Sequence, residues 1–457
     1  MNLFFVIAPV IALVTAMPVG AVTTLSLDQA IQMSLQADPR IDEKRAFVRK
    51  AQALLQEAEG SGGFRYSVDA YMAITTGLDG GFYEGGADSC NGGTGCAPRD
   101  DAYDFDDGFS VWSGFTFSII KPLTTFGQLE NYQEAARNNI LIKEQDITLE
   151  KEAIKLDVVR AYYGYLAARD GRYLMLDTQK RLQAALDLVQ NWLEQDTGGA
   201  KLSDQFALQA GMGLIQRYLA EAGALESIAM EGLKLLTGIA REEPVELEDS
   251  RLRAVSLPDR ELDEWVETAL SGRAEFKQVE AGLASRRALV EAKRASKKPI
   301  IYAGVAGSAA YAPDRERLDN PYIYDPFNHV ALSPLIGMRW QWEADAQPAR
   351  VAQEQAELDA LVSRASFARK GIPFQVAEQY YQVHAKYKAM EAMKNSAQAA
   401  RRWMISSYTD FEAGLEKADK VLSAMQAYVL AYAEYLKIVN EYNNHVSKLN
   451  SVSGVYE

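Results

Sequence analysis

Cysteine and histidine are scarce in this chain of 457 residues, which contains two cysteines and three histidines. The histidines, His329, His384 and His445, are widely separated, and no Ser/His/Asp arrangement or phosphate-binding glycine loop accompanies them. Carboxylates are plentiful, but they lie mostly on expected helical faces beside lysine and arginine, so no acid–base pair can be singled out. The sequence therefore predicts no enzyme, no cofactor and no catalytic or metal site.

Long hydrophobic runs are absent after residue 21, which excludes a transmembrane helix in that part of the chain. The apolar N-terminal segment ends in Val19-Gly20-Ala21, a small-residue pattern typical of cleavage after Ala21. We therefore expect a signal peptide at 1–21 and an exported mature chain. A membrane role would then require strands, because the polar backbone must be hydrogen-bonded within a closed sheet if it is not helical.

A surplus of basic residues is also lacking, since the formal net charge is −14. This acidity argues against nucleic acid as a partner. It fits a surface or lumen that attracts cations, and it fits equally well long helices with solvated charges.

The two cysteines, Cys90 and Cys96, lie in a glycine-rich loop. An exported chain meets an oxidising compartment, where such a pair can form a disulfide. The alternative is a metal site, but no histidine lies nearby to complete it, so a disulfide is favoured. Five aspartates follow, and a solvated loop is expected there in preference to weak calcium binding, because the spacing of a known calcium loop is missing. These aspartates are Asp100, Asp101, Asp104, Asp106 and Asp107.

The first half of the mature chain, residues 22–240, is expected to form one structural repeat. An amphipathic helix runs to about Glu59, and two alternating, aromatic-rich segments then predict strands at about 64–76 and 107–121. A helix of roughly 65 residues follows at 126–195, on the order of 100 Å long. The chain turns at the glycines near residue 198 and returns as a helix at 204–238, with Gly238 as its C-cap.

The second half repeats this order after a proline-containing linker at 241–260. Residues 261–457 are expected to form the second repeat, whose elements are a helix at 262–295, strands at about 299–311 and 330–342, a long helix at 342–408 and a return helix at 416–448. Gly371-Ile372-Pro373 should kink or break the second long helix, because proline removes a backbone donor and clashes with the preceding turn.

Apolar seams in the long helices predict coiled-coil packing. In the first long helix, Ile147, Ile154, Val158, Ala161 and Tyr165 recur at steps of seven, four, three and four. The second return helix carries a tyrosine-rich heptad from Met425 to Val446, which at this spacing indicates packing in preference to a ligand-binding stripe.

Four strands in one chain cannot close a transmembrane β-barrel, because open strand edges are not tolerated in lipid. The two strand pairs reach about 9 to 12 residues per strand, which is enough to span a bilayer. Three copies would supply twelve strands, an even number within the usual range. The expected fold class is therefore mainly α with a β-barrel portion formed by oligomerisation.

The chain resembles the TolC-like outer membrane factors over nearly its whole mature length. The segments that carry the likeness are LSLDQAIQMSLQADPRI at the start, KPLTTFGQLENYQEAARNN after the second strand, LSDQFALQAGMGLIQ followed by LKLLTG, and YTDFEAGLEKADKVLSAMQAYVLAYAEYLKIVNEYNNHVSKL near the end. No single segment is a strict motif, and it is their order and spacing together that are specific.

The resemblance implies a homotrimer in the outer membrane of a Gram-negative bacterium, with a twelve-stranded barrel continued by an α-helical periplasmic tunnel. The linker and the C-terminal end would belong to a girdle around its middle. Such channels are passive exit ducts of multidrug efflux pumps or type I secretion systems, and they dock to a periplasmic adaptor and an inner-membrane transporter. The resemblance does not identify the transported substrate or the system that this chain would serve.

The resemblance also assigns roles to the two helix reversals, which would be the periplasmic tips where the adaptor docks. Gly198, Gly199 and Ala200 occupy the first tip, and Gly414 and Leu415 match a Gly-Leu pair at the second. Simple turn chemistry is the alternative role for these residues.

Polar links hold the tips closed in this family, and Asp204 matches its acidic position at the start of the first return helix. Lys201, Lys417 and Asp419 are the other candidate gate residues. At the second tip the chain departs from members that carry arginine after the glycine, because Glu416 stands there. Solvated charges of little individual weight are the alternative.

A second function class remains open from the sequence, namely a periplasmic coiled-coil structural or adaptor protein without a membrane barrel. The four aromatic segments of bilayer length, at equivalent places in both halves, favour the channel.

Overall fold

The computed structural model describes residues 23–78, 100, 104, 108–197, 200–315, 317 and 324–455. Several predictions lie outside these residues. They are the signal peptide at 1–21, the pair Cys90 and Cys96, the tip glycines Gly198 and Gly199, and three loop aspartates, Asp101, Asp106 and Asp107.

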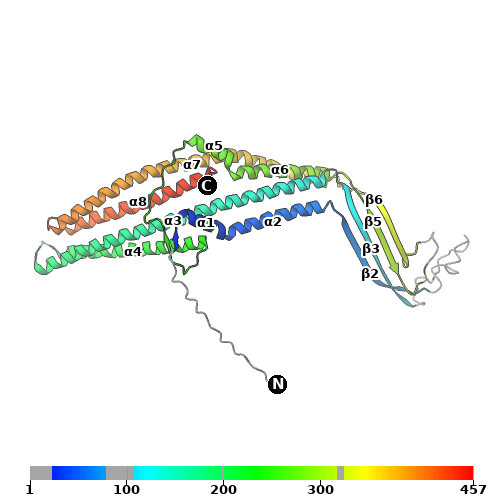
Figure 1. Cartoon of the computed structure of the whole chain (residues 1–457), viewed down its shortest axis with the longest axis horizontal. Helices are drawn as coiled ribbons and strands as arrows, with labels where there is room; N and C mark the ends of the chain where they lie inside the picture. The colour runs from blue at the N-terminus through cyan, green and yellow to red at the C-terminus, as the bar shows by residue number, and fades with distance from the viewer. Residues whose placement is uncertain are drawn as a thin grey trace, which may run out of the picture. The chain divides into compact units, whose positions relative to one another are not determined.

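The element order repeats once along the chain (Figure 1), which confirms the tandem repeat. The first repeat contains α1 (Leu27–Ala37), α2 (Pro39–Gly60), β2 (Arg65–Thr76), β3 (Phe109–Thr124), α3 (Gln128–Gln195) and α4 (Leu202–Thr237). The second contains α5 (Leu262–Gly272), α6 (Ala274–Ala295), β5 (Ile300–Tyr311), β6 (His329–Arg339), α7 (Ala346–Glu412) and α8 (Ala418–Val452). Two short strands, β1 (Thr23–Leu25) and β4 (Val245–Leu247), precede these repeats.

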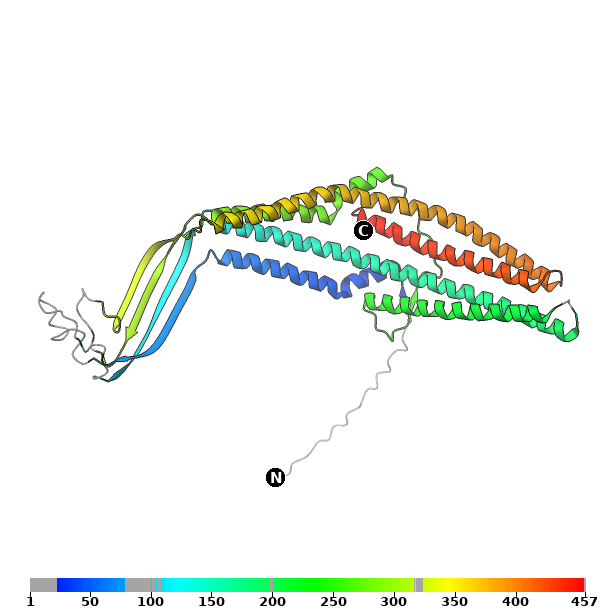
Figure 2. The same cartoon turned by 180° about the vertical axis from the view of Figure 1, so that it is seen from behind.

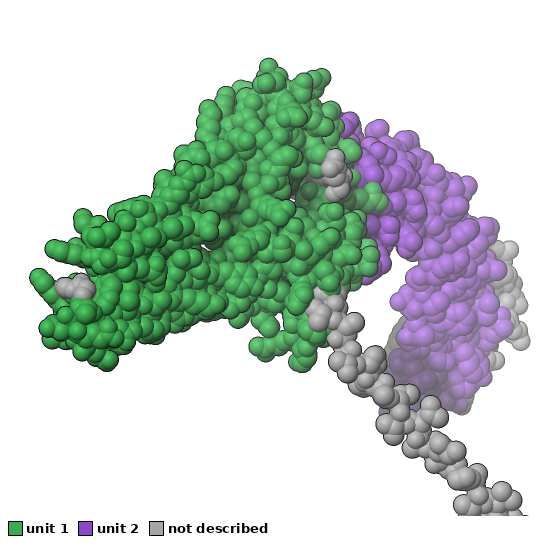
Figure 3. All heavy atoms as spheres, turned by 60° about the vertical axis from the view of Figure 1, so that its left-hand side comes forward, with its two compact units in different colours: residues 1–45, 144–277, 366–457 green, residues 46–143, 278–365 purple. Residues whose placement is uncertain are grey.

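The chain divides into two compact units, each assembled from separate stretches of both repeats (Figure 3). Unit 1 comprises residues 1–45, 144–277 and 366–457, and it holds the helical hairpins and the linker. Unit 2 comprises residues 46–143 and 278–365, and it holds the four-stranded sheet and the helix segments next to it.

Two long helices of 68 and 67 residues, α3 and α7, dominate the chain. Each turns back into a return helix, so that α3 lies beside α4 and α7 beside α8 in both views (Figures 1 and 2). Gly414 makes the second turn possible with a φ of +74°, a left-handed conformation that glycine adopts without a Cβ clash. Gly238 caps α4 in the same conformation, with a φ of +72°, and its N–H donates to the carbonyl oxygen of Lys234.

Two clusters of buried side chains form the core of unit 1. One joins α3, α4, α7 and α8 near the turns, through residues such as Leu182, Leu208, Met404 and Val421. The other packs α1, the short strands and the linker against α3, α7 and α8. Most of the first long helix's predicted seam belongs to this second cluster, because Ile154 and Val158 are fully buried there and Ile147 packs against them.

Two helices that the sequence predicted as continuous are divided in the structure. Asp38 is extended, with φ −73° and ψ +119°, and it separates α1 from α2 because the residue before Pro39 avoids the helical conformation. Arg273 is likewise extended, at φ −65° and ψ +135°, and it separates α5 from α6 directly after Gly272, a residue type that weakens helices. The sequence predicted one continuous helix to Glu59 and another at 262–295. Both predictions were wrong, because each of these segments forms two helices.

The predicted break at Pro373 does not occur, because α7 runs through it without interruption. Ile372 and Val376 are buried on the two sides of the proline. Burial of each such side chain contributes about 1.5 to 3 kcal/mol, comparable with the roughly 3 kcal/mol that proline costs in a helix interior. The two buried side chains together therefore offset the cost of proline, and the helix stays continuous.

The linker between the repeats contains an element that the sequence did not reveal. Strand β4 pairs in parallel with β1, with Thr23 opposite Val245 and Leu25 opposite Leu247. Both strands have only three residues, too few for a periodic signal.

The sheet of unit 2 is antiparallel throughout, with the order β2-β3-β5-β6. All four strands lie within or next to the predicted segments, although β3 extends to Thr124 and β6 ends at Arg339. The register shifts between Pro122 and Thr124, where proline cannot donate to the ladder.

Candidate functional site

The sheet of unit 2 has one apolar face and one mixed face, on which small and polar residues stand beside Tyr71, Trp112, Tyr302 and Leu335. Successive side chains of a strand point to opposite faces, so the pairing register assigns every residue to one of them. We call the first the apolar face. Its large, solvent-exposed members are Tyr66, Val68, Met72, Ile74, Phe109, Val111, Phe115, Tyr311, Val330, Leu332, Ile336 and Met338.

Two neighbouring rows across the sheet illustrate the contrast. On the apolar face, Val68 pairs with Phe117, Phe117 with Gly307, and Gly307 with Leu332. One residue back along β2, Ser67 pairs with Ser118, and the row continues through Ala306 to Ser333. The hydroxyl oxygens of Ser67 and Ser118 lie 2.8 Å apart, within hydrogen-bond distance. An exposed apolar face of this extent needs a nonaqueous neighbour, since soluble monomers seldom leave so large an apolar patch in water.

In unit 1, polar side chains anchor the linker to the long helices. Asn443 of α8 is fully buried; its amide donates to the carbonyl oxygen of Arg253 and its oxygen accepts the N–H of Val255, at 2.8 and 3.0 Å. On α3, the Tyr162 hydroxyl donates to Asp249 Oδ2 at 2.8 Å. These bonds connect a segment without regular structure to the helical core.

Asp170 of α3 also holds the linker, because its Oδ2 accepts the N–H of Leu252 at 2.9 Å. The side chain is 2% exposed, and its second oxygen has no hydrogen-bond partner among the described residues. Burial raises the pKa of Asp170 above its ordinary value, although the Leu252 N–H and the charges of Arg251 and Arg169 act in the opposite direction.

The described tip residues lie at the turns of the two hairpins in unit 1. Ala200 precedes α4, and Gly414 and Leu415 lie between α7 and α8. The Leu415 side chain is 80% exposed, so the second tip presents an apolar side chain to its surroundings.

The candidate gate residues lie at the starts of the two return helices, and Asp204 takes part in a helix cap. Asp204 Oδ2 accepts the backbone N–H of Lys201 at 2.9 Å, which satisfies a donor at the start of α4. Lys417 is the residue before α8, and Asp419 lies in its first turn, where a carboxylate suits the helix dipole. Within the described residues of one chain, no ion pair joins Asp204 to Lys201 or Lys417.

An aromatic contact between the tips was not foreseen from the sequence. Trp192, near the end of α3, packs against Phe411, near the end of α7, with ring centroids 5.2 Å apart. Phe411 is only 2% exposed. Trp192 and Phe411 hold equivalent positions near the ends of the two long helices. Their equivalent positions were the one feature of the sequence that could have suggested this contact.

Neither membrane-spanning helices nor metal clusters occur in the parts of the chain that the structure describes. None of the helices there has the length and apolar content needed to cross a membrane. No three His, Cys, Asp or Glu side chains there are placed to hold a metal ion.

No protein-family model matches the sequence. Among curated proteins, the chain is 29% identical to Protein CyaE of Bordetella pertussis over 147 residues. The match covers 32% of this chain and 30% of that protein, so it spans less than a third of either.

Solved structures match over almost the whole chain. The Campylobacter jejuni CmeC outer membrane channel aligns with a TM-score of 0.74 at 12% identity, over 99% of this chain and 94% of that one. CusC, described in connection with transmembrane channel formation, aligns with a TM-score of 0.74 at 14% identity, over 95% and 93%. The outer membrane protein VceC of Vibrio cholerae aligns with a TM-score of 0.72 at 13% identity, over 94% and 96%. The chain therefore has the fold of the TolC-like outer membrane factors.

Proposed function

We propose that this protein is an outer membrane channel, the passive exit duct of an efflux or secretion system in a Gram-negative bacterium. The observation that carries the proposal is the sheet of unit 2, whose apolar face suits lipid. The opposite face holds polar side chains such as Ser67, Thr116 and Ser333, which suit a water-filled passage. The likeness in fold to channels such as CmeC supports it.

Within the part of one chain that the structure describes, the outer edges of β2 and β6 have no partner strand, since these are the ends of the sheet order. In lipid such edges must be paired. We therefore infer a homotrimer in which β2 of one copy pairs with β6 of the next.

The experiment that tests this function combines fractionation with conductance. Outer membrane fractions should contain a detergent-resistant trimer that dissociates on heating, and the purified trimer should conduct ions in a planar bilayer. A soluble periplasmic monomer without conductance would instead support the second function class, a coiled-coil structural or adaptor protein.

The tips are proposed to dock a periplasmic adaptor that couples the channel to an inner-membrane transporter. Support comes from the exposed Leu415 beside Gly414, a small residue that allows a helical hairpin to approach closely. Leu415→Glu should abolish export while the amount of trimer in the membrane stays unchanged. Export at the wild-type rate would remove Leu415 from the docking surface.

The gate proposal concerns Asp204 with Lys201 or Lys417, and it needs a variant that spares the cap. Asp204→Asn removes the charge but keeps an oxygen that accepts the Lys201 N–H. If the charge closes the tip, Asp204→Asn and Lys417→Ala should each raise the conductance. If neither variant changes it, these residues are caps and nothing more.

A further inference from the structure

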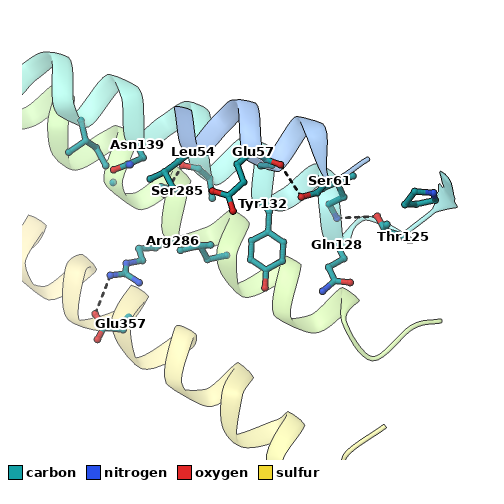
Figure 4. Close-up of a pocket in the computed structure, with 18 of the residues that line it drawn as sticks. Leu54, Glu57, Ser61, Thr125, Gln128, Tyr132, Asn139, Ser285, Arg286 and Glu357 are labelled. Atoms are coloured by element: carbon teal, nitrogen blue, oxygen red, sulfur yellow. Dashed lines mark hydrogen bonds and ion pairs between the residues drawn. The ribbon is translucent and has the colours of Figure 1, made fainter. Parts of the chain in front are cut away.

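Unit 2 has a half-open cavity of about 950 Å³ between its helices, next to the ends of the strands. Figure 4 shows α2, α3 and α6 on one side of it and α7 on the other, with Tyr132 and Arg286 between them. We call it the junction cavity. Its volume lies in the range of small-molecule binding sites, about 300 to 1,000 Å³.

Polar contacts hold the four helical walls together. Gln133 of α3 donates to the carbonyl oxygen of Ala58 in α2 at 3.3 Å, and Ser285 of α6 donates to the carbonyl oxygen of Ala135 in α3 at 3.0 Å. Arg286 of α6 lies 3.4 Å from Glu354 and 3.5 Å from Glu357, both in α7. These contacts join α2 to α3, α3 to α6 and α6 to α7, so that the four helices around the cavity are connected in sequence.

The lining is apolar over much of its surface. Apolar side chains that remain partly accessible come from all four helices, and they include Leu54, Leu129, Ile142, Val279, Leu289 and Leu361. Two of them, Leu361 and Ile142, approach Gly282, where an added Cβ would lie 3.2 Å from Leu361 Cδ2 and 3.9 Å from Ile142 Cδ1. This surface would favour an apolar or aromatic body.

The charged residues of the lining are mostly positive. Four arginines, Arg65, Arg286, Arg339 and Arg364, line the cavity, against two carboxylates, Glu57 and Glu357. Arg286 is paired with Glu357. Arg65, Arg339 and Arg364 are exposed, and no carboxylate among the described residues lies within 4.0 Å of their guanidinium groups. This is a local excess of positive charge in a chain whose net charge is −14.

We propose that the junction cavity binds an amphiphilic organic anion, with an apolar or aromatic body and one carboxylate, sulfonate or phosphate head. The apolar lining would take the body, and Arg65, Arg339 or Arg364 would take the head in a charge-assisted hydrogen bond. A cationic amphiphile would meet uncompensated like charge. The site uses only unit 2, so it does not depend on the proposal of a conducting channel.

Two fluorescent probes with almost the same body test this directly. 8-Anilinonaphthalene-1-sulfonate carries an anionic head, and N-phenyl-1-naphthylamine lacks it. Both are titrated into the purified full-length protein in amphipol, free of detergent micelles. We expect the sulfonate probe to bind at least about tenfold more tightly than the neutral probe, as a single charge-assisted hydrogen bond would provide. Equal affinities would overturn the proposal.

Three variants locate the binding. The triple variant Arg65→Gln/Arg339→Gln/Arg364→Gln should weaken binding of the sulfonate about tenfold and leave the neutral probe unchanged, which also shows that the cavity is intact. Ala136→Trp, from a partly exposed wall residue, should weaken both probes. Arg369→Gln, an exposed arginine of α7 outside the lining, is the control and should change neither. Unchanged sulfonate binding in the triple variant would refute the site.

The natural anion can come from the membrane as an acidic lipid or from solution. Organic extraction of the purified wild type and of Ala136→Trp, followed by mass spectrometry, separates these sources. An acidic lipid retained only by the wild type identifies the membrane, and sulfonate binding without retained lipid identifies solution; either result supports the site. Equal lipid in both proteins together with unchanged probe binding in Ala136→Trp would overturn it. A wild-type protein that conducts ions but binds neither probe would count against the site and leave the channel proposal standing.

Discussion

Trp192 and Phe411 pack ring against ring in unit 1, with centroids 5.2 Å apart and planes inclined at 64°. One residue lies near the end of α3 and the other near the end of α7, so the contact ties the two helical hairpins together close to their turns. Around it, Leu182, Met404 and Val421 are buried in the same cluster.

Phe411→Ala should loosen the tips. Phe411 is 2% exposed, and replacing a buried phenylalanine with alanine costs about 3 to 5 kcal/mol through lost burial and the cavity left behind. Hydrogen exchange should therefore accelerate at the ends of α3 and α7. Leu415→Ala, at a side chain that is 80% exposed, is the control and should leave exchange there unchanged. Equal exchange in both variants would mean that the aromatic contact does not hold the hairpins together.

Asn443→Ala should release the linker from α8. The variant leaves the Arg253 carbonyl and the Val255 N–H without their partner, at a cost of about 2 kcal/mol. Protection of residues 251–257 from hydrogen exchange should fall. The neighbouring Asn444 bonds only within its own helix, to Asn440, so Asn444→Ala serves as the matched control. Linker protection that survives in Asn443→Ala would show that other contacts hold this segment.

Asp170→Asn should change the pH dependence of stability. Because burial raises the pKa of Asp170 above 3.8, the folded chain binds this proton at a higher pH than the unfolded chain does. The wild type therefore loses stability as the pH rises from about 3.8 through the raised pKa. The variant keeps an acceptor for the Leu252 N–H but carries no charge.

Melting temperatures measured between pH 4 and pH 8 test whether the charge of Asp170 lowers stability as the pH rises. The variant should melt at or above the wild-type temperature at pH 7, and the difference should vanish towards pH 4. Asp177→Asn, at a half-exposed carboxylate of the same helix paired with Arg181, is the comparison and should show no such gain. A variant that is less stable than the wild type at pH 7 would contradict the prediction.

Leu332→Arg and Ser333→Arg should have opposite outcomes, although the residues are adjacent in β6. Leu332 is 68% exposed on the apolar face, and an arginine facing lipid costs about 2 to 4 kcal/mol at mid-membrane depth. The amount of heat-dissociable trimer in outer membranes should fall for Leu332→Arg and stay near the wild-type level for Ser333→Arg. Equal amounts would mean that the apolar face does not contact lipid.

Periodicity predicted the long helices and the strands well, because a heptad seam runs through α3 and apolar residues recur at every second position through most of β2 and β6. It failed at Asp38 and at Arg273, where the apolar pattern continues across a backbone that leaves the helical region at a single residue. Pro39 and Gly272 both indicate a helix boundary in the sequence. The amphipathic pattern on either side of them nevertheless predicts a continuous helix.

Pro373 is the opposite case. The rule that proline breaks a helix predicts an interruption there, but burial of Ile372 and Val376 keeps α7 continuous. The remaining misses arise from tertiary contacts. The Trp192–Phe411 pair, the anchoring of the linker by Asn443 and the junction cavity join residues far apart in the sequence, and no local pattern encodes such distances.

Unit 2 is built from two stretches of chain that are far apart, and this sets an order of events during synthesis. Strand β3 pairs with β5, which is made only after α3, α4, α5 and α6. In that interval the first strand pair has an open edge and an apolar face without a partner, a combination that invites aggregation. The chain is therefore most prone to aggregation in the interval between synthesis of β3 and synthesis of β5.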